Sequence, residues 1–263
     1  MHTGLQGKVV LITGGSKGIG KAVALAMAEE GARLGLCARD ERRLKLAADE
    51  IQIRTHADIV AVKANVTKVN DIRRFVDTVI RKFSHIDILV NNAGGAHIGG
   101  ISTTTDEEWE YHIQLKLLGY IRMAREVIPH MKTNGSGKII NIVGTTGKEP
   151  GPLYMVPGVT NAALLSFTKS LSKELEQFRI HVNSVNPGTT DTPLTEETFH
   201  ALAEIFQKTP VEVRASASEF SPQGAIATPE DIAKAVLFFA SDLSNFVNGT
   251  SLNVDAGKLV GLW

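Results

Sequence analysis

Short apolar runs alternate with longer helical patterns along this chain, and the alternation limits its fold more than any other feature. Strands that are apolar throughout are typical of a parallel sheet whose two faces are both covered. The expected strands cover residues 9–12, 34–38, 59–62, 86–90, 138–143, 180–185 and 251–254. The expected helices cover residues 18–30, 39–54, 69–83, 106–131, 159–178 and 229–240.

Buried strands separated by helices predict an α/β fold, a Rossmann-type doubly wound parallel sheet with helices on both faces. A length of 263 residues fits one such domain, so residues 1–263 are expected to form a single unit. Residues 188–228 are the least regular part, with one short helical pattern at 196–207. Because ligands of such sheets bind beyond the carboxyl ends of the strands, this segment is expected to be a flap on the substrate side.

The charge balance excludes several classes of partner. The chain has 28 lysine and arginine residues and 28 aspartate and glutamate residues, so it presents no basic footprint for nucleic acid or an anionic membrane. No apolar run is long enough to span a membrane, and residues 1–7 lack the apolar core of a secretory signal. A cytoplasmic location is therefore expected. His97, His112 and His181 show no metal-ligand spacing, so no metal site is expected.

A glycine-rich turn stands between the first expected strand and the first expected helix, with Gly14, Gly18 and Gly20 in the segment 13–20. Glycine lets the backbone turn tightly and approach a pyrophosphate closely, and the following helix offers free N–H groups. A second motif, Asn-Asn-Ala-Gly at 91–94, follows the fourth expected strand. Together the two motifs predict a dinucleotide site at the carboxyl ends of the strands.

The spacing Gly-x-x-x-Gly-x-Gly and the Asn-Asn-Ala-Gly motif resemble those of the short-chain dehydrogenase/reductase family, over nearly the whole chain. The resemblance implies a nicotinamide dinucleotide, a small-molecule substrate and a homodimer or homotetramer. Residues 187–192 look like the family's nicotinamide-side loop, and residues 254–257 like its C-terminal turn. The implied cofactor contacts are Gly14, Ser16, Lys17, Gly18, Ile19, Gly20, Arg39, Asn65, Val66, Asn92, Ala93, Gly94, Asn161, Pro187, Gly188 and Thr190.

The residues around the second strand favour NADP(H) over NAD(H). An acidic residue at the end of that strand would bind the ribose 2′-hydroxyl of NAD. This chain has Ala38 followed by Arg39 there, and Lys17 in the glycine turn. Two cations without an acid suit the 2′-phosphate of NADP. The alternative is that Lys17 and Arg39 are ordinary surface residues.

The positions that carry catalysis in this family hold other residues here. The segment 162–171 resembles the helix after the family's Tyr-x-x-x-Lys pair, and counting back places Pro157 at the tyrosine and Asn161 at the lysine. The family's serine falls on Gly144 and its helical asparagine on Lys116. In the family the tyrosine exchanges a proton with the substrate carbonyl, and the lysine lowers the tyrosine pKa and holds the ribose. Proline has no proton to give, so the usual chemistry lacks its central group.

Nearby residues offer replacements. The spacing Tyr154-x6-Asn161 looks like the Tyr-x6-Lys stretch of the family's enoyl-reductase branch, which makes Tyr154 a candidate proton donor or polariser of the substrate carbonyl. Lys116 is a candidate cation, Thr145 or Thr146 a candidate hydroxyl donor, and Asn161 a candidate ligand of the ribose hydroxyls. The alternatives are that Tyr154 packs on the flap and that Lys116 is a solvated helix residue.

Three functions fit these residues. The first is an NADP(H)-dependent oxidoreductase with atypical catalytic groups that acts on a carbonyl, an alcohol or an activated alkene. The second is a catalytically inactive NADP(H)-binding protein that serves as a sensor or subunit, and the third is a lyase or isomerase on the same scaffold. Six apolar side chains suit either a subunit interface or an intrachain core: Leu115, Leu118, Ile121, Leu164, Leu165 and Leu171.

Overall fold

The computed structural model describes residues 2–95, 97–221 and 223–260. Its centre is a seven-stranded parallel sheet in the order β3-β2-β1-β4-β5-β6-β7, so the chain reverses its direction of travel across the sheet between β3 and β4. The strands are β1 (Val9–Thr13), β2 (Arg33–Ala38), β3 (Ile59–Lys63), β4 (Ile88–Asn91), β5 (Gly137–Ile142), β6 (Ile180–Pro187) and β7 (Ser251–Val254). This arrangement confirms the predicted doubly wound α/β fold.

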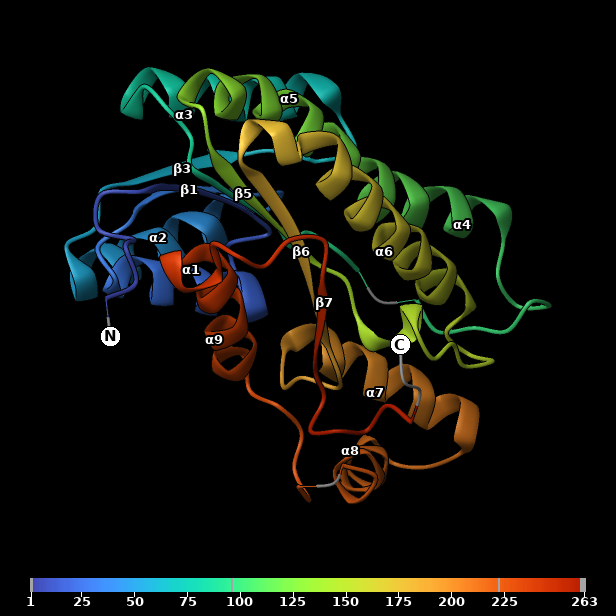
Figure 1. Ribbon diagram of the computed structural model, residues 1–263. Helices are drawn as coiled ribbons and strands as arrows, with labels where there is room; N and C mark the ends of the chain where they lie inside the picture. Colours follow the sequence, from blue (N-terminus) through green and yellow to red (C-terminus); the bar gives the residue numbers. More distant parts are fainter. Residues whose placement is uncertain (1, 96, 222, 261–263) are drawn as a thin grey trace.

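Helices cover both faces of the sheet, as Figure 1 shows. Helices α1, α2 and α9 pack on one face, and α3, α5 and α6 pack on the other. The bounds are α1 (Gly18–Glu29), α2 (Glu41–Thr55), α3 (Val69–Phe83), α4 (Asp106–His112), α5 (Leu118–Asn134), α6 (Met155–Leu175) and α9 (Pro229–Ala240). Two further helices, α7 (Pro193–Phe206) and α8 (Pro210–Glu219), lie beyond the carboxyl ends of the strands and are called the lid below. Within the described ranges, no helix is both long and apolar enough to cross a bilayer.

Each face of the sheet has its own hydrophobic core because successive side chains of a strand point to opposite faces. Along β1, Val10 and Ile12 pack with α1 and α9, whereas Val9 and Leu11 pack with α3 and α5. All four side chains are fully buried. Truncating a residue such as Ile12 or Leu11 to alanine costs roughly 2–5 kcal/mol in cores of this kind. The strand that leads into the glycine turn is therefore held firmly from both sides.

Thr-Pro pairs begin three helices in the last third of the chain. The hydroxyls of Thr192, Thr209 and Thr228 each accept the backbone N–H three residues further on, and a proline follows as the first helical residue. Proline costs nothing there because that N–H has no partner within the helix. The flap expected to hold one short helix at 196–207 therefore holds two, and the Thr209-Pro210 pair marks the second.

Two expected helices differ from the prediction beside the sheet's carboxyl edge. A π-helical turn (Ile113–Leu117) divides the helix expected over 106–131 into α4 and α5, and Lys116 lies within that turn. Helix α6 begins at Met155 rather than at 159. It passes through Pro157 because a proline in the first turn of a helix loses no hydrogen bond.

Candidate active site

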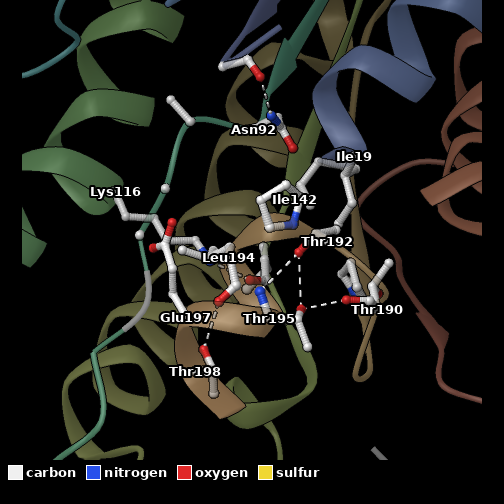
Figure 2. Close-up of a pocket in the computed structure, with 18 of the residues that line it drawn as sticks. Ile19, Asn92, Lys116, Ile142, Thr190, Thr192, Leu194, Thr195, Glu197 and Thr198 are labelled. Atoms are coloured by element: carbon white, nitrogen blue, oxygen red, sulfur yellow. Dashed lines mark hydrogen bonds between the residues drawn. The ribbon is translucent and has the colours of Figure 1, made fainter. Parts of the chain in front are cut away.

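A cleft of about 1050 Å³ lies between the carboxyl ends of the strands and the lid. The close-up in Figure 2 shows residues of α7 facing Asn92, Ile19 and Lys116 across this space. Most of the predicted site residues line it: Gly14, Ser16, Lys17, Ile19, Arg39, Asn65, Val66, Asn92, Ala93, Gly94, Lys116, Thr145, Tyr154, Pro187, Gly188 and Thr190. Gly18, Gly20 and Asn161 are not among the lining residues.

The glycine turn depends on its glycines for two different reasons. Gly14 has φ +71° and Gly18 has φ +54°, a region that side chains other than glycine rarely adopt. Gly20 is needed for space, because a Cβ atom there would lie 2.2 Å from the Gly14 carbonyl oxygen. The two glycines that do not line the cleft, Gly18 and Gly20, thus shape the turn that does.

Asn92 joins the second motif to the glycine turn. Its Nδ2 donates to the carbonyl oxygen of Thr13 at 3.0 Å and lies 3.3 Å from that of Gly14. The backbone N–H groups of Asn92 and Ala93 donate to the Thr13 hydroxyl at 2.9 and 3.0 Å. These bonds fix the end of β4 against the end of β1, so the two motifs together form one rigid wall of the cleft.

Cations line the part of the cleft beside β2. The Arg39 guanidinium donates to the Tyr111 hydroxyl at 2.5 Å, and Arg43 lines the same wall. Lys17 Nζ lies 3.4 Å from Glu197 Oε1 of the lid. Tyr111, Arg43 and Glu197 belong to no recognisable motif, so the sequence alone gives no reason to place them here.

The first acidic residue after β2 is Asp40, which also lines the cleft. Its carboxylate caps α2 by accepting the Arg43 N–H at 3.0 Å, and it lies 3.4 Å from Nε of the same arginine. Capping by a side chain of this type contributes about 1 kcal/mol to a helix. The carboxylate is thus engaged by the start of the helix and by a neighbouring cation.

Asn161 packs against Gly144, which lines the cleft. Asn161 is 3% exposed, and its Nδ2 donates to the Thr146 hydroxyl at 2.8 Å. Its Oδ1 is buried and has no hydrogen-bond partner among the residues described. Asn161 therefore holds the turn of residues 145–147. Asn161 does not itself line the cleft, although its partner Thr146 does, so its role as a ligand of the ribose hydroxyls stays a prediction.

Lys116 reaches the cleft from the π-helical turn. Its Nζ donates to the carbonyl oxygen of Val143 at 2.5 Å, just beyond the end of β5. Burial lowers the pKa of Lys116 to about 8, because a desolvated ammonium is less stable than a hydrated one. Lys116 is therefore largely charged at neutral pH, and its titration falls in a pH range that experiments can cover.

His112 lies one helical turn before Lys116. Its Nε2 is 3.1 Å from the Gly95 carbonyl oxygen, so this nitrogen carries the proton that makes the bond. Burial, and then the charge of Lys116, lower the pKa of His112 to about 4. At neutral pH His112 is uncharged, and Lys116 is the cation of this neighbourhood.

Tyr154 lies immediately before α6, between the cleft and the lid. It packs with Phe199, Leu202 and Val213 of the lid. Burial raises the pKa of its hydroxyl, so Tyr154 stays protonated at neutral pH and is a donor rather than a base. Among the described residues none forms a hydrogen bond with this hydroxyl, which leaves the donor available to the cleft.

Polar contacts hold the lid in place. Arg214 of α8 forms an ion pair with Asp191 at 2.6 Å and a second one with Glu196 of α7. Figure 2 shows the contact at the start of α7, where the Thr195 hydroxyl donates to the carbonyl oxygen of Thr190. These contacts fasten both lid helices to the loop that follows β6.

Comparisons with known proteins agree on one family. The model of a family described as enoyl-(acyl carrier protein) reductase matches residues 14–258. The 3-oxoacyl-[acyl-carrier-protein] reductase FabG of Thermotoga maritima is 33% identical over 261 residues, which cover 97% of this chain and 99% of that protein. The chain belongs to the short-chain dehydrogenase/reductase family. This family is one of oxidoreductases.

Solved short-chain dehydrogenase/reductase structures share the whole architecture. L-sorbose reductase from Gluconobacter frateurii, in complex with NADPH and L-sorbose, has a TM-score of 0.94 and 33% identity over 100% of both chains. A xylitol dehydrogenase bound to NAD+ has a TM-score of 0.92 and 25% identity over 96% of this chain and 99% of the other. Because these relatives bind different nicotinamide cofactors, the choice made by this chain depends on its own residues.

The four positions that are expected to carry the tetrad of the short-chain dehydrogenase/reductase family divide into two groups. Lys116 and Gly144 line the cleft, so these positions still face the space for ligands. Pro157 lies in the first turn of α6 and, like Asn161, is not a lining residue. The positions expected for the family's tyrosine and lysine thus contribute no side chain to the cleft, whereas Tyr154 and Thr145 do.

Proposed function

We propose that this chain is an NADP(H)-dependent oxidoreductase that interconverts a carbonyl and an alcohol, or reduces an activated alkene, with atypical catalytic groups. The observation that carries the proposal is that Tyr154, Lys116 and Thr145 line the same cleft as the glycine turn. A proton donor, a cation and a hydroxyl beside a dinucleotide site are the groups that reduction of a carbonyl needs.

The glycine turn fits a dinucleotide. Lys17 is the N-cap of α1, and its side chain makes no capping hydrogen bond with the first turn of the helix. The free N–H groups of that turn therefore suit the acceptor oxygens of a pyrophosphate, which the helix dipole also favours. Gly20 supports this role because any side chain there would collide with the Gly14 carbonyl oxygen and disrupt the turn.

The cations beside β2 support NADP(H) over NAD(H). Lys17, Arg39 and Arg43 line this end of the cleft, and Ala38 ends the strand where an acid would bind a ribose hydroxyl. The carboxylate of Asp40 is occupied with capping α2. A 2′-phosphate would meet guanidinium groups that match its geometry. The NADPH-bound sorbose reductase, at 33% identity, is consistent with this choice.

Bound NADPH would supply a hydride to the substrate carbon. Tyr154 donates its proton to the carbonyl oxygen as that bond becomes an alcohol, and solvent returns a proton to the tyrosine. The Lys116 ammonium stabilises the negative charge that develops on the oxygen, and the Thr145 hydroxyl adds a hydrogen bond. A positioned general acid contributes about 10²–10⁴ in rate.

A catalytically inactive NADP(H)-binding protein, a sensor or a subunit, is the second candidate. The observation that favours it is the packing of Asn161 against Gly144, which uses the position of the family's lysine for structure. A tyrosine without a cationic neighbour keeps a pKa near or above ~10 and transfers protons poorly at neutral pH. Activity through Tyr154 therefore needs a cation in the same cleft, and Lys116 is the candidate for it.

Two measurements test the proposal. Nucleotide fluorescence is titrated first, and NADPH is expected to bind at least about tenfold more tightly than NADH. NADPH oxidation is then followed with panels of ketones, aldehydes and enones. Tyr154→Phe is expected to lower kcat by about 10²–10⁴ at unchanged NADPH affinity, whereas Tyr111→Phe is expected to leave kcat unchanged. Tight NADPH binding without turnover of any substrate supports the second candidate, and absence of nucleotide binding overturns both.

We also propose that the chain forms a homodimer or homotetramer. Leu115, Leu164 and Leu171 are buried in the chain's own core, so they form intrachain contacts. Better interface candidates are two exposed residues, Leu252 of β7 and Phe246 shortly before it, since β7 is an edge strand of the sheet. An exposed apolar edge is a template for pairing with another chain. Light scattering after size exclusion tests this, and a mass of one chain overturns it.

A further inference from the structure

Lys116 is a cation without a carboxylate partner among the described residues. Its one hydrogen bond goes to the Val143 carbonyl oxygen, and burial alone accounts for the lowered pKa of its ammonium. Glu197, an acid of the lid that lines the same cleft, is engaged elsewhere, since it pairs with Lys17. A desolvated charge with no counter-ion is costly unless a ligand provides one.

The ammonium group has donors to spare. A lysine ammonium carries three N–H donors, and the Val143 carbonyl accepts one of them. Lys116 lines the cleft, and Figure 2 shows its side chain extending from the helix into the pocket. Two donors on one positive centre are therefore available to a bound molecule.

The lid offers an apolar surface to the same cleft. Phe199, Leu202 and Val213 are buried, pack together in a small cluster of their own and line the cleft, as does Ala217. Tyr154 packs against this cluster. A ligand that fills the space thus meets a cation on the sheet side and an apolar wall on the lid side.

We infer that the substrate is a 2-oxo acid with an apolar substituent, or the corresponding 2-hydroxy acid in the reverse direction. This inference rests on the proposed function. A 2-oxo acid carries a carboxylate oxygen and a ketone oxygen on adjacent carbons, so one ammonium can donate to both. Its negative charge neutralises Lys116, and its substituent packs on the lid wall.

The reaction balances with the groups already named. Bound NADPH would supply a hydride to the ketone carbon, and the π electrons of the carbonyl would move to its oxygen. That oxygen takes the Tyr154 proton, which gives a 2-hydroxy acid and NADP+. The carboxylate remains on Lys116 throughout, so the same cation holds the substrate and stabilises the developing alkoxide.

A matched pair of ligands tests the inference by binding alone. Benzoylformate and its carboxamide differ only in the charged oxygen, and their affinities are measured by calorimetry with NADP+ present and by ligand-observed NMR without nucleotide. Benzoylformate is expected to bind at least about tenfold more tightly, as one charge-assisted hydrogen bond allows. Lys116→Gln is expected to reduce the ratio to about threefold or less, and Lys116→Arg to retain it.

The lid wall has its own variant. Leu202→Ala is expected to lower the affinity for benzoylformate several-fold. The affinity for pyruvate, which lacks a large apolar group, is expected to stay unchanged. The ratio between acid and amide should remain as in the wild type. Unchanged NADP+ affinity and a single cooperative thermal transition serve as the check that each variant is folded.

Several results would overturn the inference. Equal binding of acid and amide by the wild type would do so, and so would a preference that persists in Lys116→Gln. A loss of NADP+ affinity in that variant without any acid preference would assign the cation to the cofactor. Absent NADPH oxidation alongside a Lys116-dependent acid preference would count against the proposed activity and leave this binding site standing.

Discussion

Gly144 and Asn161 share one side-chain space, since a Cβ atom on Gly144 would lie 2.9 Å from Nδ2 of Asn161. Gly144 also has φ +128°, a backbone conformation that side chains rarely permit. These two residues stand where relatives of this family are expected to have serine and lysine. The two positions are thus coupled in this chain, and neither can be returned to the family's residue without disturbing the other.

The substitution Gly144→Ser is expected to lower the free energy of unfolding by about 1–3 kcal/mol, from backbone strain and from the contact with Asn161. Gly7→Ser is the matched control, because Gly7 has φ +75° and no atom within 4 Å of a built Cβ. The Gly7 variant measures the cost of backbone strain alone, because its new side chain meets no neighbour. Urea denaturation measures both. Equal losses in the two variants would contradict the coupling of Gly144 with Asn161.

Asn161→Lys is expected to destabilise the fold rather than rebuild the family's site. Asn161 is 3% exposed, so a lysine there would bury an ammonium beneath the turn of residues 145–147. Placing an unpaired charge in such a position costs about 3–5 kcal/mol. Thermal denaturation of the variant, with and without Pro157→Tyr, measures the effect. A stable double variant with increased NADPH oxidation would refute this expectation.

The sheet and the glycine turn were predictable from the sequence because both depend on local patterns. Apolar runs identify the strands, and glycines at 14, 18 and 20 identify the turn. The burial and the hydrogen bond of Asn161 were not predictable in this way. Its contact with Thr146 depends on how α6 packs against the turn after β5. The π-helical turn at Lys116 arises in the same manner, since no residue type in 113–117 specifies it.

The desolvation of Lys116 should be visible in the pH dependence of the free energy of unfolding. Its pKa is about 8 in the folded chain and near its ordinary 10.5 in an unfolded one, so the unfolded state binds more protons between these values. Stability from this group therefore rises as pH increases from 8 to 10.5. Lys116→Met is expected to stabilise the protein at pH 7 by roughly 1–3 kcal/mol and to remove this dependence.

A difference curve isolates that effect from other groups. Burial also lowers the pKa of Lys138 to about 8, so the wild-type curve alone contains both lysines. Subtracting the Lys116→Met curve leaves Lys116, because His112, with a pKa of about 4, is already neutral in this range. Urea denaturation from pH 7 to 10.5 provides the data. A flat difference curve would show that Lys116 is not desolvated in the folded protein.

The contact between Lys17 and Glu197 should influence nucleotide affinity. Glu197→Gln releases Lys17 from its partner at 3.4 Å and is expected to increase NADPH affinity about two- to fivefold, a size suited to an exposed ion pair. Lys17→Met is expected to lower the affinity for NADPH more than the affinity for NADH. Glu204→Gln, an exposed acid on the same helix, is the control. Fluorescence titration measures all three, and equal effects of the two glutamate variants would contradict the prediction.

The lid has a small core of its own, formed by Phe199, Leu202, Ala203 and Val213, apart from the two cores that flank the sheet. Substitutions in this cluster can reshape one wall of the cleft while the residues that stabilise the sheet stay as they are. Selection for a new substrate could then proceed with little risk to folding. In this chain, the apolar wall of the cleft and the cores that stabilise the sheet are thus made of different residues.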